Sequence, residues 1–247
     1  MKTEEQKVVE NWEGVWKKLK IGKWDYVSEV IYQTLYKYVP CTKAKLILEA
    51  GSGSGRISCR LKESSKSEVV LLDISKTAIK ISKKVFAERG QTGFFVLGSI
   101  FNMPLKDEVF DFVWNAGVLE HFSECERFFA FKEMVRVCKN NGLIVTLNPY
   151  SRAIFYKIGK WFAEKTNKWI YGYEKPIKSM KGFEENCIIK AEYSVDFDTT
   201  INFLSFIPIL NRFTTLLKRI FKKLPERVLN HYGYLLVSIA RKVGETF

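Results

Sequence analysis

The sequence predicts a doubly wound α/β fold, in which helices cover both faces of a mostly parallel, Rossmann-like sheet. Five short apolar runs alternate with segments that are compatible with helices. They are LILEA (46–50), VVLLD (69–73), FFVLG (94–98), VFDFVWN (109–115) and LIVTLN (143–148). Runs that are apolar on both sides are typical of parallel strands buried between two helical layers. The first run leads into a glycine-rich turn, GSGSG (51–55), and open α/β sheets bind ligands at such strand ends.

Length and composition fit one elaborated domain over residues 1–247. A chain of 247 residues that is 47% hydrophobic and 15% aromatic can bury the core of a complete α/β domain. The charged start MKTEEQKVVE has no apolar signal-peptide region, and no run of about 18 apolar residues could span a membrane. We therefore expect a cytoplasmic protein.

The cysteines and the net charge bear on the kind of protein and on its partners. Cys41, Cys59, Cys125, Cys138 and Cys187 form an odd set without a C-x-x-C pair, which argues against a disulfide framework and a zinc knuckle. We expect reduced thiols and no metal. The net charge of +13 predicts an anionic partner, which could be nucleic acid, an acidic ligand or a membrane surface.

Helices are predicted before the sheet and two more strands after it. Apolar residues of segment 8–19 recur on one helical face, and a second helix should run from about Asp25 to Tyr38 and stop at Pro40. CIIKAEYSVDF (187–197) and YGYLLVSIARK (232–242) bring the expected sheet to seven strands. The predicted organisation is N-terminal helices (1–40), a core (42–149), a lid-like insertion (150–186), and final strands (187–247) around an amphipathic insertion (199–230).

The turn GSGSG has two interpretations. Dinucleotide dehydrogenases also place glycines there, but their third glycine comes three residues after the second, where this sequence has Arg56. The spacing of Gly51, Gly53 and Gly55, with Glu49 ahead of them, instead resembles motif I of the class I S-adenosylmethionine-dependent methyltransferases, of the methyltransferase type 11-like kind.

Later segments resemble the same family in order and spacing. GSIFNMPLKDEVFDFVWNAGVLEHF (98–122) is similar to its third strand, G-D-x-x-x-L-P-F segment, F-D-x-V strand and x-x-V-L-E-H loop. EMVRVCKNNGLIVTLNP (133–149) is similar to its next helix, turn and fifth strand. The resemblance covers residues 42–149 and implies that the sheet ends with an antiparallel final strand.

The resemblance implies S-adenosylmethionine as the cofactor and assigns its contacts. Glu49 and the three glycines would form the cofactor loop, Asp73 would accept hydrogen bonds from the ribose, and Ile74 would lie against the adenine. The residues that would border the methionine end and the reacting methyl group are Asn115, Ala116 and Gly117.

Three of these assignments have alternatives. Ser99 stands where the family usually has an acid for the adenine amino group, and a hydroxyl is a weaker acceptor, so the backbone at Ile100 could anchor the adenine instead. Asp73 could cap the helix that starts near Ser75, and Asn115 could make only local hydrogen bonds.

His121 is the candidate general base. It lies in VLEHF just beyond the fourth predicted strand, and the ordinary pKa of imidazole suits proton transfer near neutrality. The alternative is that Glu120 and His121 only shape the loop before the helix that starts at Glu124. His231 is expected to be structural.

The implied reaction is in-line transfer of a methyl group to a small-molecule or lipid-like acceptor. LNPY (147–150) resembles the N-P-P-Y motif of adenine amino-methyltransferases, but it follows the fifth strand instead of the fourth and lacks the second proline. Nucleic acid is therefore the weaker partner, and an RNA methyltransferase or RNA-binding module on the same fold is the alternative. A non-catalytic nucleotide-binding regulator comes third.

Two basic amphipathic segments, residues 152–170 and 209–224, lie outside the core. In the second, ILNRFTTLLKRIFKKL, apolar residues recur at helical spacing, basic residues occupy the other face and no acid interrupts them. This pattern predicts either a helix on an anionic membrane, giving peripheral association, or a helix that packs on the sheet or closes the substrate pocket.

Overall fold

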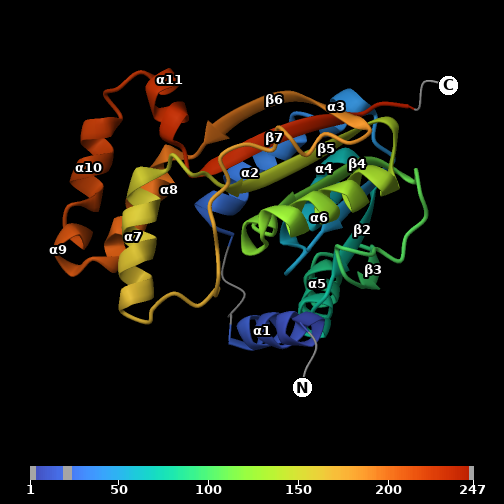
Figure 1. The fold of residues 1–247 in the computed structure, drawn as a ribbon, viewed down its shortest axis with the longest axis horizontal. Coiled ribbons are helices and arrows are strands. Elements are labelled where there is room, and N and C mark those ends of the chain that lie inside the picture. Colours follow the sequence, from blue (N-terminus) through green and yellow to red (C-terminus); the bar gives the residue numbers. More distant parts are fainter. Residues whose placement is uncertain (1–3, 19–23, 245–247) are drawn as a thin grey trace.

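The computed structural model describes residues 4–18 and 24–244, and its centre is a seven-stranded sheet (Figure 1). The strands lie in the order β3-β2-β1-β4-β5-β7-β6. Their bounds are β1 (Leu46–Ala50), β2 (Glu68–Asp73), β3 (Phe94–Leu97), β4 (Phe110–Ala116), β5 (Cys138–Pro149), β6 (Cys187–Val195) and β7 (Leu235–Lys242). Strand β7 pairs antiparallel with both β5 and β6, and the other pairs are parallel. The predicted fold class is confirmed.

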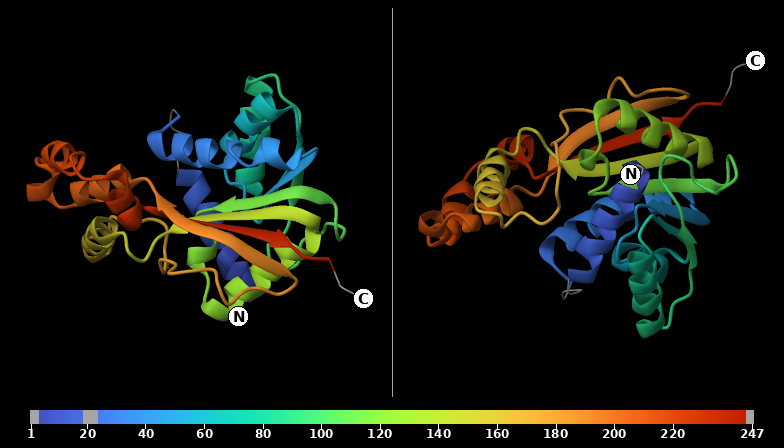
Figure 2. Two further views of the ribbon diagram at one scale, coloured as in Figure 1. Left: turned by 90° about the horizontal axis from the view of Figure 1, so that it is seen from above. Right: turned by 60° about the horizontal axis from the view of Figure 1, so that its bottom comes forward.

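Helices cover both faces of this sheet (Figure 2). One face packs on α2 (Tyr26–Tyr36), α4 (Arg56–Ser65) and α5 (Lys76–Glu88), which bury Leu35, Leu61 and Phe86 against β1 and β2. The other face packs on α6 (Glu124–Val137), which buries Phe131 and Met134. Because both faces are covered, the central strands are apolar throughout, as the sequence pattern predicts.

The helix ends follow local capping chemistry. Asp25 caps α2 through a 2.8 Å hydrogen bond from the Ser28 N–H, and Ser123 forms a capping box with Glu126 at the start of α6. Helix α2 ends at Tyr36, and Pro40 lies in the first turn of a separate short helix, α3 (Val39–Thr42), because proline fits only the first turn of a helix.

The segments outside the core gather at one end of the molecule (Figure 1). After β5 comes α7 (Ile154–Lys165), and between β6 and β7 come α8 (Phe197–Asn202), η2 (Phe203–Phe206), α9 (Pro208–Asn211), α10 (Thr214–Phe221), α11 (Glu226–Leu229) and η3 (Asn230–Tyr232). The remaining elements are α1 (Glu4–Lys18), at the amino end, and η1 (Leu119–His121), after β4.

The amphipathic segment 209–224 differs from the single helix that its periodicity suggests. It is broken into α9 and α10 between Asn211 and Thr214. Phe221 packs on the neighbouring helices α7 and α8, where its ring centre lies 5.4 Å from that of Phe155 and 5.2 Å from that of Phe197. The apolar residues Ile209, Phe213, Leu216, Ile220 and Leu224 are exposed. One part of the apolar face is therefore packed against other helices, and the other part is exposed to solvent.

Among the residues described, no helix is long and apolar enough to cross a membrane. The four cysteines whose side chains are described, at positions 59, 125, 138 and 187, are unpaired thiols. Burial raises the pKa of Cys59 to about 11 and of Cys138 to about 12, so both stay protonated and serve as small core side chains.

Candidate functional site

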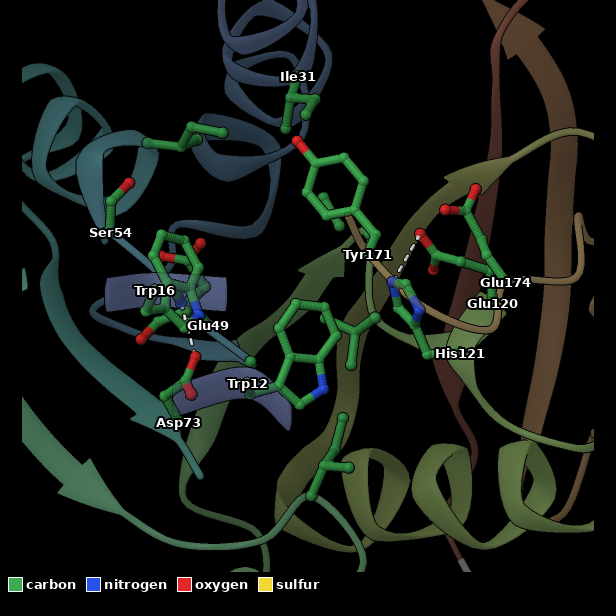
Figure 3. A pocket seen from close by; sticks show the side chains of 18 of the residues that line it. Trp12, Trp16, Ile31, Glu49, Ser54, Asp73, Glu120, His121, Tyr171 and Glu174 are labelled. Atoms are coloured by element: carbon green, nitrogen blue, oxygen red, sulfur yellow. Dashed lines mark hydrogen bonds and ion pairs between the residues drawn. The ribbon is translucent and has the colours of Figure 1, made fainter. Parts of the chain in front are cut away.

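A cavity of about 680 Å³ opens at the carboxyl ends of β1, β2 and β4 (Figure 3). This volume lies within the range of about 300–1,000 Å³ that is common for small-molecule sites. One half is lined by the glycine turn, Asp73 and residues 98–101. The other half is lined by Gly117, Glu120, His121, Trp169, Tyr171, Glu174, Phe203, Phe206 and Tyr234. The predicted site therefore continues into residues of both insertions.

The glycine turn is held by its own backbone hydrogen bonds. The N–H groups of Gly51 and Ser52 donate to the carbonyl oxygen of Leu72 at 2.8 and 2.9 Å. Gly53 has φ +52°, and a Cβ there would lie 2.5 Å from the Trp16 ring. Bare backbone at Gly53 thus lets an aromatic side chain from α1 approach the turn.

Gly55 has a different role from the other two glycines. It precedes α4 with φ +65°, and a Cβ there would lie 2.3 Å from Cδ2 of Leu71 and 3.0 Å from Cβ of Ser82. It does not line the cavity. The absent side chain lets α4 pack closely on β2 and α5, so the structure assigns Gly55 to packing.

Asp73 is buried at the end of β2 and binds the turn. Its Oδ2 accepts a hydrogen bond from the Gly53 N–H at 2.7 Å, and its Oδ1 accepts one from the Ser75 N–H at 2.8 Å. Burial raises the pKa of Asp73, although these two hydrogen bonds act in the opposite direction. Helix α5 is capped by Ser75, whose Oγ accepts from the Ala78 N–H, so Asp73 is not the side-chain cap of this helix.

Glu49 lies at the end of β1, beside Asp73, and lines the cavity. Only 5% of the residue is exposed, and its Oε2 has no hydrogen-bond partner among the described residues. Burial raises its pKa well above the ordinary value. Two buried acids at adjacent strand ends suit a ligand that brings hydroxyl and ammonium donors, as S-adenosylmethionine does.

The other expected cofactor residues divide between the cavity and the core. Ile74, Ser99 and Ile100 line the cavity, as do Ala116 and Gly117. The Ser99 hydroxyl already accepts a hydrogen bond from the Phe101 N–H at 3.3 Å.

Asn115 does not line the cavity. Its side chain is buried, and Nδ2 lies 3.4 Å from Sδ of Met134 on α6. Because successive side chains of a strand point to opposite faces, Asn115 faces the opposite side of β4 from Trp114 and Ala116, which line the cavity.

His121 lies in the cavity wall with a defined tautomer. Its Nδ1 lies 2.7 Å from the carbonyl oxygen of Tyr173, and since a carbonyl can only accept, Nδ1 carries the hydrogen. Nε2 is then an acceptor, 3.9 Å from Oε1 of Glu120. Burial lowers the pKa of the imidazole. The side chain is neutral and basic at Nε2, which suits a general base.

Helix α1 supplies site residues that were not predicted from the sequence. Trp12 and Trp16 line the cavity, and both rings point into it (Figure 3). Glu13 anchors the helix: its Oε1 accepts from the Ser75 hydroxyl and from the Thr77 N–H, each at 3.0 Å. The sequence does show aromatic residues on the predicted helical face of segment 8–19. Only the contacts of α1 in the structure show that this face covers the cavity.

Glu120 and Glu174 are also site residues that the sequence analysis did not assign. They are 2% and 9% exposed, and their carboxyl groups lie beside each other at the end of the cavity away from Asp73 (Figure 3). Burial and their mutual repulsion raise the pKa of Glu120 well above its ordinary value. Within the described part of the chain, no group of three or more histidine, cysteine and acidic side chains could hold a metal ion.

A family model described as "Methyltransferase domain" matches residues 48–146. An uncharacterized methyltransferase-like protein of Schizosaccharomyces pombe is 31% identical over 100 residues, which are 40% of this chain and 36% of that protein. The chain thus aligns with little more than a third of that relative's length.

Two solved structures share the fold over nearly the whole chain. A structure from work on the conversion of a disulfide bond into a thioacetal group in echinomycin biosynthesis has a TM-score of 0.63 at 17% identity, covering 96% of this chain and 94% of that one. A protein of Pyrococcus horikoshii has a TM-score of 0.62 at 16% identity, covering 93% and 98%. The segment 48–146, at the centre of this fold, is thus similar to the methyltransferase domain family.

Proposed function

We propose that the protein transfers a methyl group from S-adenosylmethionine to a small-molecule acceptor. The observation that carries this proposal is the continuity of one cavity from the glycine turn and Asp73 to an aromatic compartment. Gly117, just after β4, lies beside Glu120 of the aromatic compartment, since a Cβ placed on Gly117 would be 3.6 Å from Oε1 of Glu120. A donor and an acceptor could therefore meet near Gly117, as in-line transfer requires.

The residues of the cavity have separate tasks in this proposal. When bound, S-adenosylmethionine supplies an electrophilic methyl group on a sulfonium centre. Asp73 and Glu49 hold its donor groups, and the rings of Trp12 and Trp16 exclude water from the glycine turn. His121 takes up the acceptor's proton at Nε2, which lies 3.9 Å from Oε1 of Glu120.

The acceptor half of the cavity favours a small or lipid-like molecule with an apolar body. Its wall is formed by Trp169, Tyr171, Phe203, Phe206 and Tyr234. These rings come from the loop after α7, from η2 and from the residue before β7. The insertions outside the family core therefore supply the surfaces that would choose the acceptor.

Binding and label transfer test this function. We expect S-adenosylhomocysteine to bind in calorimetry and NADH not to bind. We expect a labelled methyl group of S-adenosylmethionine to appear in a component of a small-molecule or lipid extract, and not when Asp73→Asn is used. Preferential binding of NADH would contradict the proposal, and so would label that appears only in RNA.

We further propose that α10 holds the enzyme against an anionic membrane surface. Phe213, Leu216, Ile220 and Leu224 form an exposed apolar row with 42–52% of each residue accessible. Arg219, Lys222 and Lys223 are exposed beside this row, and no acid lies between residues 209 and 224. An apolar row with basic flanks suits a helix in the headgroup region, where each basic residue adds about 1 kcal/mol on an anionic surface.

Cosedimentation with vesicles tests the membrane proposal. We expect the protein to bind vesicles that contain phosphatidylserine, to ignore pure phosphatidylcholine vesicles, and to bind less at high salt. Replacing Arg219, Lys222 and Lys223 with glutamine should weaken binding more than about tenfold. The matched control replaces Lys80, Lys83 and Lys84 on α5. Equal loss in both variants, or binding to RNA but not to vesicles, would contradict the proposal.

A further inference from the structure

The acceptor half of the cavity contains two buried acids, Glu120 and Glu174, and among the described residues neither is ion-paired with a lysine or arginine. Glu120 is 2% exposed and its Oε2 has no hydrogen-bond partner among the described residues. Glu174 is 9% exposed and accepts a hydrogen bond from the Tyr156 hydroxyl. Both line the cavity. A buried carboxylate is costly unless a cation or several donors compensate its charge.

The nearest basic side chains are engaged elsewhere. Arg127 donates hydrogen bonds from Nε to the Leu119 carbonyl and from Nη2 to the carbonyls of Glu120 and Lys175, and these bonds satisfy backbone oxygens. Lys160 is ion-paired with Glu164, and its Nζ lies 5.3 Å from the centre of the Trp169 ring. Oε1 of Glu120 lies 3.9 Å from Nε2 of the neutral His121. The positive charges of Arg127 and Lys160 act on Glu120 and Glu174 from a distance, and within the described residues neither acid has a direct ion pair with a lysine or arginine.

Aromatic rings surround the same compartment. The ring centres of Trp169 and Tyr171 are 5.4 Å apart, those of Phe203 and Tyr234 are 5.1 Å apart, and those of Trp169 and Phe206 are 6.3 Å apart. All five rings line the cavity. The electron-rich faces of aromatic rings attract cations, and carboxylates together with such rings form the usual recognition site of an organic ammonium group.

We propose that the acceptor is an amine, which enters as an ammonium ion between these rings and the carboxylates of Glu120 and Glu174. This inference rests on the proposed function, and it names the chemical class of the acceptor. A purely apolar acceptor would leave Oε2 of Glu120 without a donor, and a hydroxyl would supply a hydrogen bond but no positive charge beside the two acids.

Atoms and charges balance in the methyl transfer to such an acceptor. The ammonium nitrogen first gives one proton to Nε2 of His121, and the proton later leaves to solvent. The nitrogen lone pair then forms the new N–C bond while the C–S bond breaks and its electron pair stays on sulfur. The products are S-adenosylhomocysteine and a methylated ammonium ion, which carries the same charge as the ammonium that entered.

A matched pair of probes tests the inference by binding alone. Choline carries a quaternary nitrogen, and 3,3-dimethylbutan-1-ol has the same shape with a neutral carbon in its place. We expect choline to bind the S-adenosylhomocysteine-loaded protein at least about tenfold more tightly than the alcohol, in calorimetry or ligand-observed NMR. Equal affinity, or no saturable binding of choline, would overturn the inference.

Variants test whether the preference for choline depends on Glu120 and Glu174. Glu120→Gln and Glu174→Gln should each weaken choline binding about fivefold or more, while affinity for S-adenosylhomocysteine and for the alcohol stays unchanged. Glu185→Gln, which removes an exposed acid paired with Lys132, is the control. Tyr171→Leu removes a ring but keeps both acids, and it should also weaken the binding of choline.

Failure of S-adenosylhomocysteine to bind would contradict the proposed function itself. Normal binding of S-adenosylhomocysteine without a preference for choline over the alcohol would overturn only this inference.

Discussion

The carboxylate of Asp73 accepts a hydrogen bond from the backbone N–H of Gly53, with 2.7 Å between Oδ2 and the nitrogen. The acid at the end of β2 therefore shapes the turn at the end of β1. Asp73 also lines the cavity, where a ribose could be bound. One buried carboxylate thus connects the glycine turn, the second strand and the ligand site.

Asp73→Asn should weaken binding of S-adenosylhomocysteine by about 10- to 150-fold. The amide keeps the shape but loses the charged acceptor, and hydrogen bonds to a charged group contribute about 1.5–3 kcal/mol. Calorimetry gives the affinity, and thermal unfolding shows whether the turn still folds. Unchanged affinity in a folded variant would refute the ribose assignment.

Glu13→Ala should loosen α1 over the cavity. The change removes the acceptor for the Ser75 hydroxyl and the Thr77 N–H, which fix the helix to the start of α5. We expect faster amide exchange in residues 8–18 and about two- to fivefold weaker binding of S-adenosylhomocysteine. Glu88→Gln on the exposed side of α5 is the control. Unchanged exchange in α1 would show that Glu13 does not hold it.

The glycines at 53 and 55 should respond differently to alanine. At Gly55 the new Cβ meets Leu71 inside the core, and overpacking should cost about 1–3 kcal/mol of unfolding free energy. At Gly53 it meets only the far edge of the Trp16 ring, which can move with α1. Gly53→Ala should therefore affect ligand binding more than stability. Denaturant unfolding and calorimetry on both variants separate the two effects, and equal stability losses would contradict the assignment.

Glu49→Gln should stabilise the protein without ligand above about pH 4.5. Because burial raises the pKa of Glu49 well above 4.5, the folded state holds a proton that the unfolded state releases. Stability of the wild type then falls as pH rises from the unfolded pKa toward the folded one, by about 1.4 kcal/mol per pH unit. The glutamine variant lacks this loss. Thermal unfolding across pH should show the gap growing, and parallel curves would contradict the raised pKa.

His121 should titrate below 6.5 and carry its neutral hydrogen on Nδ1. Burial lowers its pKa, and the carbonyl of Tyr173 fixes the tautomer. Its contribution to stability should therefore fall as pH drops below 6.5, where the unfolded state takes up the proton first. Nitrogen-15 NMR of the imidazole reports both properties. A titration midpoint above 6.5, or hydrogen on Nε2, would exclude Nε2 as the base in the neutral protein.

Local patterns in the sequence predicted the fold and the edge of the sheet where the cavity lies. Apolar runs mark the seven strands, and the glycine spacing with Asp73 marks the edge of the sheet where the cavity lies. These features depend on residues close together in the chain, so periodicity and motif spacing record them. The same patterns did not distinguish Gly55, which packs α4, from the glycines that line the cavity.

Apart from Gly117 and His121, the residues of the acceptor half were brought together by tertiary structure alone. Glu120 and Glu174 are 54 positions apart, and only the path of the loop after α7 brings their carboxyl groups together. The apolar face of segment 209–224 looked uniform, yet packing on Phe155 and Phe197 turned Phe221 inward and left Ile220 in solvent. Helical spacing specifies that a face is apolar but not what it covers, because contacts between distant segments follow from how the whole chain packs.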